Sequence, residues 1–245
     1  MNQSDKLTSA KDKPKHDSAD ELALDRASEM SFPASDPIAV SNVTRIDAAA
    51  DSAEHAQSGR ALDHLRIAAL VTDGFEQSEL LEPKKALEAA GAQVDVVCDH
   101  GGTVQGYHHL DKGEKVKVDK LLKHLRAEDY AGVLLPGGVA NGDAMRMHEE
   151  ARDFIRRMDE ANKPIAAICH GGWLLISAGV AGDRTLTSWP SLQDDFKNAG
   201  STWVDEEVVR DENLVSSRKP DDIPAFNDAF ISLLRHEKAN AMVAR

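Results

Sequence analysis

The stretch Pro164-Ile-Ala-Ala-Ile-Cys-His-Gly-Gly172 decides the fold of this 245-residue chain. Its first half is a continuous apolar run, which indicates a strand buried on both faces of a parallel sheet. The run ends at Cys169, and a helix is predicted to begin directly after it, over Gly172–Ala178. A nucleophile in a tight turn between a strand and a helix is typical of a nucleophile elbow. The alternative interpretation is a buried core cysteine, but the two glycines permit a strained turn and favour the elbow.

Similar apolar runs alternate with amphipathic stretches along most of the chain. Further strands are predicted over Leu65–Thr72, Ala92–Cys98 and Ala131–Pro136, and further helices over Ser78–Ala90, Asp119–Leu125, Glu149–Asn162, Ser191–Ala199 and Ile223–His236. Strands that are apolar on both faces and separated by helices predict a flavodoxin-like α/β fold, a three-layer sandwich with a mainly parallel central sheet. Ligands in such folds bind beyond the carboxyl ends of the strands, so we expect the turns after these strands to form the site.

The first part of the chain has a different composition. It is rich in Ser, Asp, Ala and Lys, and Phe32 is its only aromatic residue before position 61. Such a segment buries too little apolar area to offset the entropy of ordering. We therefore expect a disordered polar extension over residues 1–62, one α/β domain over 63–237 and a short C-terminal tail over 238–245.

Charge and cysteine content exclude several classes of function. The chain carries 29 basic and 42 acidic residues, a net charge of −13, and this excludes the basic surface that nucleic acids and acidic membranes require. No apolar run approaches the roughly 18 residues of a membrane span, and the N-terminus lacks the apolar stretch of a secretory signal. Two cysteines cannot form a disulfide framework, which favours a reducing compartment. We expect a cytoplasmic protein.

Several residues are candidates for a catalytic role beside Cys169. A helix N-terminus and the adjacent His170 can both lower the pKa of a thiol. Glu76 follows the first strand in an apolar context, where a buried carboxyl could keep its proton and hydrogen-bond the sulfur. The alternative for Glu76, as for Glu79, is an acid that the helix dipole favours at a helix start.

The backbone of the glycine turn offers a second function. An N–H group of Gly138, together with that of His170, would form an oxyanion hole. The alternative is a plain turn at Gly137-Gly138 that ends a strand.

Metal and nucleotide sites find little support in the sequence. His108, His109 and Asp111 form a polar cluster, and Cys98-Asp-His100 precedes it, but the spacing fits no regular zinc pattern. No glycine-rich phosphate-binding motif is present. We therefore predict neither a metal nor a cofactor.

Six segments in the expected order resemble the PfpI family of the class I glutamine amidotransferase-like superfamily. They are Asp73-Gly-Phe-Glu-Gln-Ser-Glu-Leu-Leu-Glu-Pro83, Leu135-Pro-Gly-Gly-Val-Ala-Asn141, Ala167-Ile-Cys-His-Gly171, Leu186-Thr-Ser-Trp-Pro-Ser191, Asp205-Glu-Glu-Val-Val209 and Ser216-Ser-Arg-Lys-Pro-Asp-Asp-Ile-Pro-Ala-Phe226. The resemblance spans Leu65 to His236. It implies a flavodoxin-like domain, and where the family commonly has proline after Cys-His-Gly, this chain has Gly172.

The resemblance also implies roles for the candidate residues. Cys169 would be the nucleophile, His170 its partner, Glu76 the acid near the sulfur and Gly138 the oxyanion-hole glycine. Family members form homodimers or hexamers in which a neighbouring subunit can supply an acid to the site, and Asp143 stands near that position.

The activities that the resemblance implies share a thiolate that attacks a carbonyl. We expect a stress-protective enzyme of the glyoxalase or protein deglycase type, with a small carbonyl or peptide substrate. The alternatives are an intracellular cysteine peptidase and a redox-sensing or chaperone-like protein without turnover. Glutamine hydrolysis is disfavoured because Ser216–Phe226 lacks the histidine that glutamine amidotransferases use.

Overall fold

The computed structural model describes residues 61–243, and it describes side chains as far as residue 240. The predicted extension over residues 1–62 therefore lies almost wholly outside the described residues.

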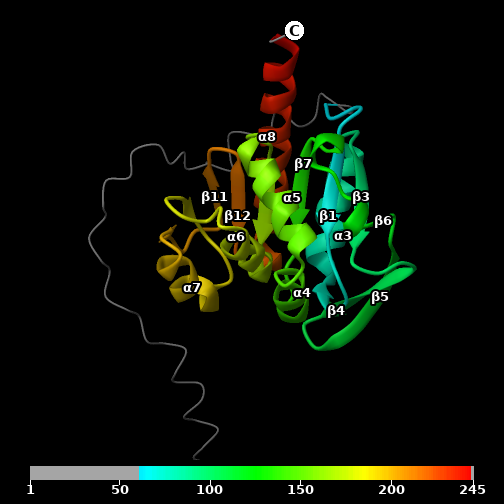
Figure 1. Cartoon of the computed structure of the whole chain (residues 1–245), viewed down its shortest axis with the longest axis vertical. Coiled ribbons are helices and arrows are strands. Elements are labelled where there is room, and N and C mark those ends of the chain that lie inside the picture. Colours follow the sequence, from blue (N-terminus) through cyan, green and yellow to red (C-terminus); the bar gives the residue numbers. More distant parts are fainter. Residues whose placement is uncertain (1–60, 244–245) are drawn as a thin grey trace, which may run out of the picture. The chain divides into compact units, whose positions relative to one another are not determined.

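A seven-stranded sheet carries the fold, in the order β11-β12-β8-β7-β1-β3-β6 (Figure 1). Its strands are β1 (Arg66–Leu70), β3 (Gln93–Cys98), β6 (Lys120–Leu121), β7 (Gly132–Leu135), β8 (Ile165–Ile168), β11 (Val208–Asp211) and β12 (Leu214–Ser217). Every neighbouring pair is parallel except β11 and β12. The predicted mainly parallel sheet is confirmed.

Helices cover both faces of this sheet. They are α3 (Gln77–Ala89), α4 (Val139–Met145), α5 (Glu149–Glu160), α6 (Trp173–Ala178), α7 (Gln193–Asn198) and α8 (Ile223–Val243). Alternate residues of β1 point to opposite faces, so Ile67 and Ala69 pack in the apolar layer of α3 and α8. Ala68 and Leu70 pack instead in the layer of α4, α5, α6 and α7. The result is the predicted three-layer α/β sandwich.

The structure also contains strands that were not predicted. β4 (Thr103–His108) and β5 (Asp111–Lys117) form an antiparallel hairpin, and β2 (Phe75–Glu76) pairs with β4. In Figure 1 this hairpin extends away from the main sheet at lower right. β5 is mostly exposed and charged, so it lacks the apolar alternation that marks a strand in a sequence. A further pair is formed by β9 (Thr185–Leu186) and β10 (Thr202–Trp203).

Two predicted elements differ from the structure. The helix predicted over Asp119–Leu125 is wrong, because that segment forms β6 at the sheet edge and then a short 3-10 turn over Leu122–His124. The last helix does not end at His236 but continues to Val243, into the stretch expected to be a tail. Within the described residues, no helix is long and apolar enough to cross a membrane.

Candidate active site

Cys169 lies in a strained turn at the carboxyl end of β8. Its φ is 58°, a left-handed conformation that a residue with a side chain seldom adopts. A 3-10 turn over Cys169–Gly172 then leads directly into α6. A Cβ at Gly171 would lie 2.2 Å from the carbonyl oxygen of Leu135, so only glycine fits there. The turn has the backbone geometry of a nucleophile elbow.

The thiol of Cys169 is buried, with 7% of the residue exposed. Nδ1 of His170 lies 3.2 Å from Sγ, and backbone N–H groups of Gly138 and His170 also bond to the sulfur. Burial raises the pKa of Cys169, a negative charge on Glu79 raises this pKa further, and the two N–H groups lower it. The lowering expected from the helix start is therefore opposed by burial. A thiolate forms most easily when Glu79 carries a proton.

The carboxyl group beside the thiol belongs to Glu79, and not to Glu76 as expected. Glu79 is fully buried, and its Oε2 accepts a hydrogen bond of 2.7 Å from the N–H of Gly137. The other oxygen makes no conventional hydrogen bond within the described residues, and the carboxyl interacts with the Cys169 side chain. Burial raises the pKa of Glu79 to about 8, so this carboxyl is mainly protonated at neutral pH.

The carboxylate of Glu76 contacts the β4–β5 hairpin and not the thiol, because Glu76 lies in β2, just before the start of α3. Its carboxylate accepts hydrogen bonds from the Ser78 hydroxyl (3.3 Å) and the His109 N–H (3.0 Å), and it lies 3.9 Å from Nδ1 of His108. Glu76 thus faces the β4–β5 hairpin. Its main chain stays close to the site, since its N–H donates to the carbonyl of Gly137 (3.2 Å).

A helical periodicity could have identified Glu79 from the sequence. Glu79, Pro83 and Leu87 recur every four residues in α3, and all three are buried. An acid in line with buried residues lies on the face that packs against the sheet. Glu76 precedes the helix and does not belong to this face.

The loop between β7 and α4 brings Gly138 to the sulfur. Gly138 has a φ of 89°, and a Cβ there would lie 2.4 Å from the carbonyl oxygen of Gly74, so no other residue fits. Asn141 holds this loop with three hydrogen bonds. It accepts from the Thr72 N–H (2.7 Å) and donates to the carbonyls of Pro136 (2.9 Å) and Gly137 (3.0 Å). Sequence reasoning did not identify Asn141, because an asparagine near a glycine turn carries no pattern of its own.

Two tryptophans fix the ring of His170. Its centroid lies 5.1 Å from that of Trp173, edge to face, and 5.7 Å from that of Trp189, which is stacked. Burial lowers the pKa of His170, so its imidazole is neutral at pH 7 and can accept a proton. The backbone N–H of Trp189 also donates to the carbonyl oxygen of Cys169 (3.4 Å).

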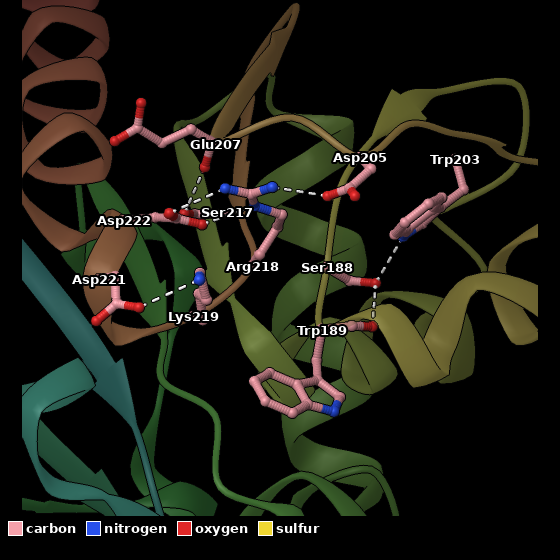
Figure 2. A network of polar contacts seen from close by, with 10 residues as sticks. All are labelled: Ser188, Trp189, Trp203, Asp205, Glu207, Ser217, Arg218, Lys219, Asp221 and Asp222. Carbon is pink, nitrogen blue, oxygen red and sulfur yellow. Dashed lines mark hydrogen bonds and ion pairs between the residues drawn. The ribbon is translucent and has the colours of Figure 1, made fainter. Parts of the chain in front are cut away.

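The segment that carries Trp189 is braced by polar contacts (Figure 2). Ser188 accepts a hydrogen bond from the indole of Trp203 (3.0 Å). After β12, Figure 2 shows Arg218 between Asp222, which binds two of its nitrogens at 2.8 and 3.1 Å, and Asp205 at 2.7 Å. Within the described residues, the hydrogen bonds of the Arg218 guanidinium go to carboxylates of the chain itself, so Arg218 joins the ends of two segments and has a structural role.

Asp143 is exposed on α4, next to the elbow. A Cβ at the preceding Gly142 would lie 2.6 Å from the carbonyl oxygen of His170, so α4 packs closely on the turn. Asp143 does not join the buried contacts of the thiol, and its role stays a prediction.

The polar residues considered for a metal separate into two places. His108, His109 and Asp111 flank the turn of the β4–β5 hairpin, where the two histidines approach Glu76. Cys98, Asp99 and His100 lie together at the end of β3.

Curated relatives resemble the domain over nearly their whole length. The chain is 40% identical over 171 residues to Deglycase PH1704 of Pyrococcus horikoshii, and the matched region covers 70% of this chain and 100% of that protein. It is also 40% identical over 171 residues to the Bacillus subtilis protein named "Putative cysteine protease YraA", covering 69% of this chain and 98% of the relative.

Solved structures and a family model give the same assignment. Drosophila melanogaster DJ-1beta superposes with a TM-score of 0.62 at 27% identity, covering 73% of this chain and 97% of that one. A two-domain protein of Anabaena variabilis with DJ-1/ThiJ/PfpI-like and ferritin-like domains superposes with a TM-score of 0.66 at 29% identity, covering 69% of this chain and 48% of that one. The model of the DJ-1/PfpI family matches residues 65–233. With the cysteine elbow at the carboxyl edge of its sheet, this chain belongs to the DJ-1/PfpI family.

Proposed function

We propose that this chain is a hydrolase that uses the Cys169 thiolate on reactive carbonyl compounds. Its substrates would be dicarbonyls such as methylglyoxal and the adducts that they form with amines. The observation that carries the proposal is the buried thiol in the elbow, in contact with the Glu79 carboxyl and the neutral ring of His170. The name deglycase, borne by several relatives at about 40% identity, is consistent with this chemistry.

The first step makes the thiolate. Nδ1 of His170, 3.2 Å from Sγ, is placed to accept the thiol proton. The raised pKa of Glu79 keeps this carboxyl protonated, which removes the charge that would oppose a thiolate. The N–H groups of Gly138 and His170 then stabilise the negative sulfur.

The second step is attack on the aldehyde carbon of methylglyoxal. A sulfur–carbon bond forms, the carbonyl electron pair moves to oxygen, and the N–H groups near Sγ are positioned to hold this oxyanion. Protonation of the oxygen by Glu79 or His170 gives a hemithioacetal. The acid and the base come from different elements, since Glu79 lies in α3 and His170 in the elbow.

The remaining steps need only proton transfer and water. A base removes the proton from the first carbon, a proton is added at the second carbon, and the product is a lactoyl thioester of Cys169. Water then cleaves the carbon–sulfur bond, which releases lactate and restores the thiol. For an amine adduct the same attack would end with release of the free amine.

A cysteine peptidase is the second candidate, and the Cys169–His170 contact favours it. Peptide hydrolysis requires protonation of the leaving amine, for which an oriented imidazole is suited. In a complete triad a third group orients the imidazole. Among the described residues no carboxylate bonds to the ring of His170, and this favours the carbonyl substrates.

The test compares substrate classes with one preparation of the full chain. Lactate formed from methylglyoxal is followed by NMR. The amine released from methylglyoxal-treated N-acetyl-lysine is measured with an amine reagent, and peptide cleavage is measured with a fluorogenic peptide. Cys169→Ala is the inactivating variant. Cys98→Ala is the matched control, since Cys98 is the other cysteine and is also buried.

We expect lactate from the wild type and from Cys98→Ala, and none above background from Cys169→Ala. Peptide cleavage without lactate would replace the proposal with the peptidase. Oxidation of Cys169 by peroxide with no turnover of any substrate would support a redox sensor instead.

A further inference from the structure

A second cluster of reactive side chains lies at the carboxyl edge of the sheet, apart from Cys169. Cys98, Asp99 and His100 end and follow β3, which is separated from β8 by β1 and β7. Asp73 follows the neighbouring strand β1, and His148 directly precedes α5. Three segments far apart in the sequence therefore bring thiol, carboxylate and imidazole groups together.

The ligand atoms in this cluster lie nearly as close together as ligands on one ion, and the side chains would draw together on binding. A ligand atom from each of Cys98, Asp99 and His100 lies within 4.8 Å of the others, and Sγ of Cys98 is 3.2 Å from Oδ1 of Asp99. Oδ2 of Asp99 is 3.9 Å from Nε2 of His148, and Nε2 of His100 is 3.8 Å from Oδ2 of Asp73. Bond lengths to tetrahedral zinc place two of its ligands roughly 3.3–3.8 Å apart.

One ring nitrogen in the cluster has no hydrogen-bond partner. Nδ1 of His100 lies 3.3 Å from the carbonyl oxygen of Gly101, which can only accept, so Nδ1 carries the proton. Nε2 then presents a lone pair toward the Asp73 carboxylate. This nitrogen is buried and without a hydrogen bond among the described residues. A lone pair opposite a carboxylate offers a place for a metal ion between or beside them.

The neighbouring groups already orient the ligands. The Thr72 hydroxyl donates to Oδ1 of Asp99 (2.7 Å), and the hydrogen bond that Nδ1 of His100 donates to the Gly101 carbonyl oxygen fixes the ring of His100. Such outer contacts fix the direction of metal ligands in known sites.

We propose that Cys98, Asp99 and His100 form a zinc site, with His148 and Asp73 within reach of the remaining coordination positions. A thiolate together with imidazole and carboxylate selects zinc over magnesium and calcium, which prefer oxygen ligands alone. On binding, the ion replaces the proton of the Cys98 thiol, which passes to solvent. No change of oxidation state is involved.

The site would clamp the edge of the sheet near the active site. It joins the end of β3 to the loop after β1 and to the segment before α5. The loop after β1 continues to Gly74, whose carbonyl lies against Gly138. Because zinc would bind the folded protein and not the unfolded chain, it would raise the melting temperature of the full chain.

The test uses the full chain after removal of metals with a chelator. Cobalt(II) is titrated as a spectroscopic substitute for zinc, and zinc is then used to displace it. We expect one equivalent of cobalt with a thiolate-to-cobalt charge-transfer band, both in the wild type and in Cys169→Ala. The band should vanish in Cys98→Ala. In His100→Gln, a change at a partly exposed position that is not expected to impair folding, zinc affinity should fall at least about tenfold.

Other outcomes would overturn the site. A band that persists in Cys98→Ala but is lost in Cys169→Ala would place the metal at the active-site thiol. A wild type that binds no cobalt at equimolar concentration, and whose melting temperature zinc leaves unchanged, would show that the cluster holds no metal ion. Turnover of methylglyoxal by the metal-free chain is measured alongside, so that failure of the zinc site is distinguished from failure of the enzyme.

Discussion

At the scale of single residues, the chemistry rests on a carboxyl group that the protein keeps out of water. Glu79 is fully buried, so its carboxyl group is desolvated, and it accepts one hydrogen bond from the N–H of Gly137. Burying an ionisable group in this way lowers the stability of the fold. The same burial provides an acid that stays protonated at pH 7 beside the thiol.

The first prediction concerns Glu79→Gln. The pKa of Glu79 is about 8 in the folded protein, above its ordinary value of 4.5, so the folded state holds this proton more tightly. Its contribution to stability is therefore complete below pH 4.5 and is lost as the pH rises toward 8. Glutamine does not titrate, and we expect it to raise the free energy of unfolding at pH 7 by roughly 2–3 kcal/mol. Urea denaturation at pH 5 and pH 8 measures the difference.

The same variant should lose turnover, by about 10²–10⁴-fold, because it removes the proton source beside Cys169. Glu82→Gln, on the exposed side of the same helix, is the control and should change neither quantity. If Glu76→Gln abolished turnover while Glu79→Gln retained it, the assignment of the acid would be reversed.

At the scale of elements, the site depends on how the ends of three strands are joined. Asn141 ties the end of β1 to the loop after β7, which carries Gly138 to the sulfur at the end of β8. Asn141 is 1% exposed, and its side-chain amide uses both its oxygen and its nitrogen. Among side chains of this length, asparagine alone supplies an acceptor together with two donors.

The second prediction is that Asn141→Asp displaces this loop. A carboxylate cannot donate to the carbonyls of Pro136 and Gly137, and it would be charged and buried. We expect the free energy of unfolding to fall by about 2 kcal/mol, and kcat for methylglyoxal to fall more than KM rises. The pH profile of Cys169 alkylation should shift as well, since the N–H of Gly138 moves. Asn198→Asp, an exposed site at the end of α7, is the matched control.

The elements of the central sandwich could be predicted from the sequence, and the hairpin could not. β1, β3, β7 and β8 are continuous apolar runs, because both of their faces are covered. β5 has exposed charges on both faces and lies at the edge of its sheet, paired with β4, so its sequence shows no apolar alternation. The wrong choice between Glu76 and Glu79 has the same origin, since Glu76 is directed toward this unpredicted hairpin.

At the scale of the whole molecule, the parallel order of the strands brings the chemistry to one edge. Cys169, Gly138 and the cluster at Cys98 all lie at the carboxyl ends of parallel strands of one sheet, β8, β7 and β3. This could be expected from the topology, because ligands of such sheets bind at that edge. The contacts of His170 with Trp173 and Trp189 could not be predicted from the topology, since they depend on side-chain packing across the elbow.

The third prediction concerns residues 1–60. The family match begins at residue 65, and relatives of about this domain's length are covered almost completely. We therefore expect a chain that begins at residue 61 to keep its unfolding midpoint and its turnover. Thermal denaturation and lactate formation, compared with the full chain, measure both. A large loss of either would show that the first residues contribute to the domain.

The most direct measurement is carbon-13 NMR of the full chain with labelled methylglyoxal. We predict a hemithioacetal signal bound to the protein at early times, followed by labelled lactate, with both absent in Cys169→Ala and present in Cys98→Ala. Lactate that forms equally in Cys169→Ala, or a wild type that gives neither signal, would contradict the central claim that Cys169 attacks a carbonyl carbon.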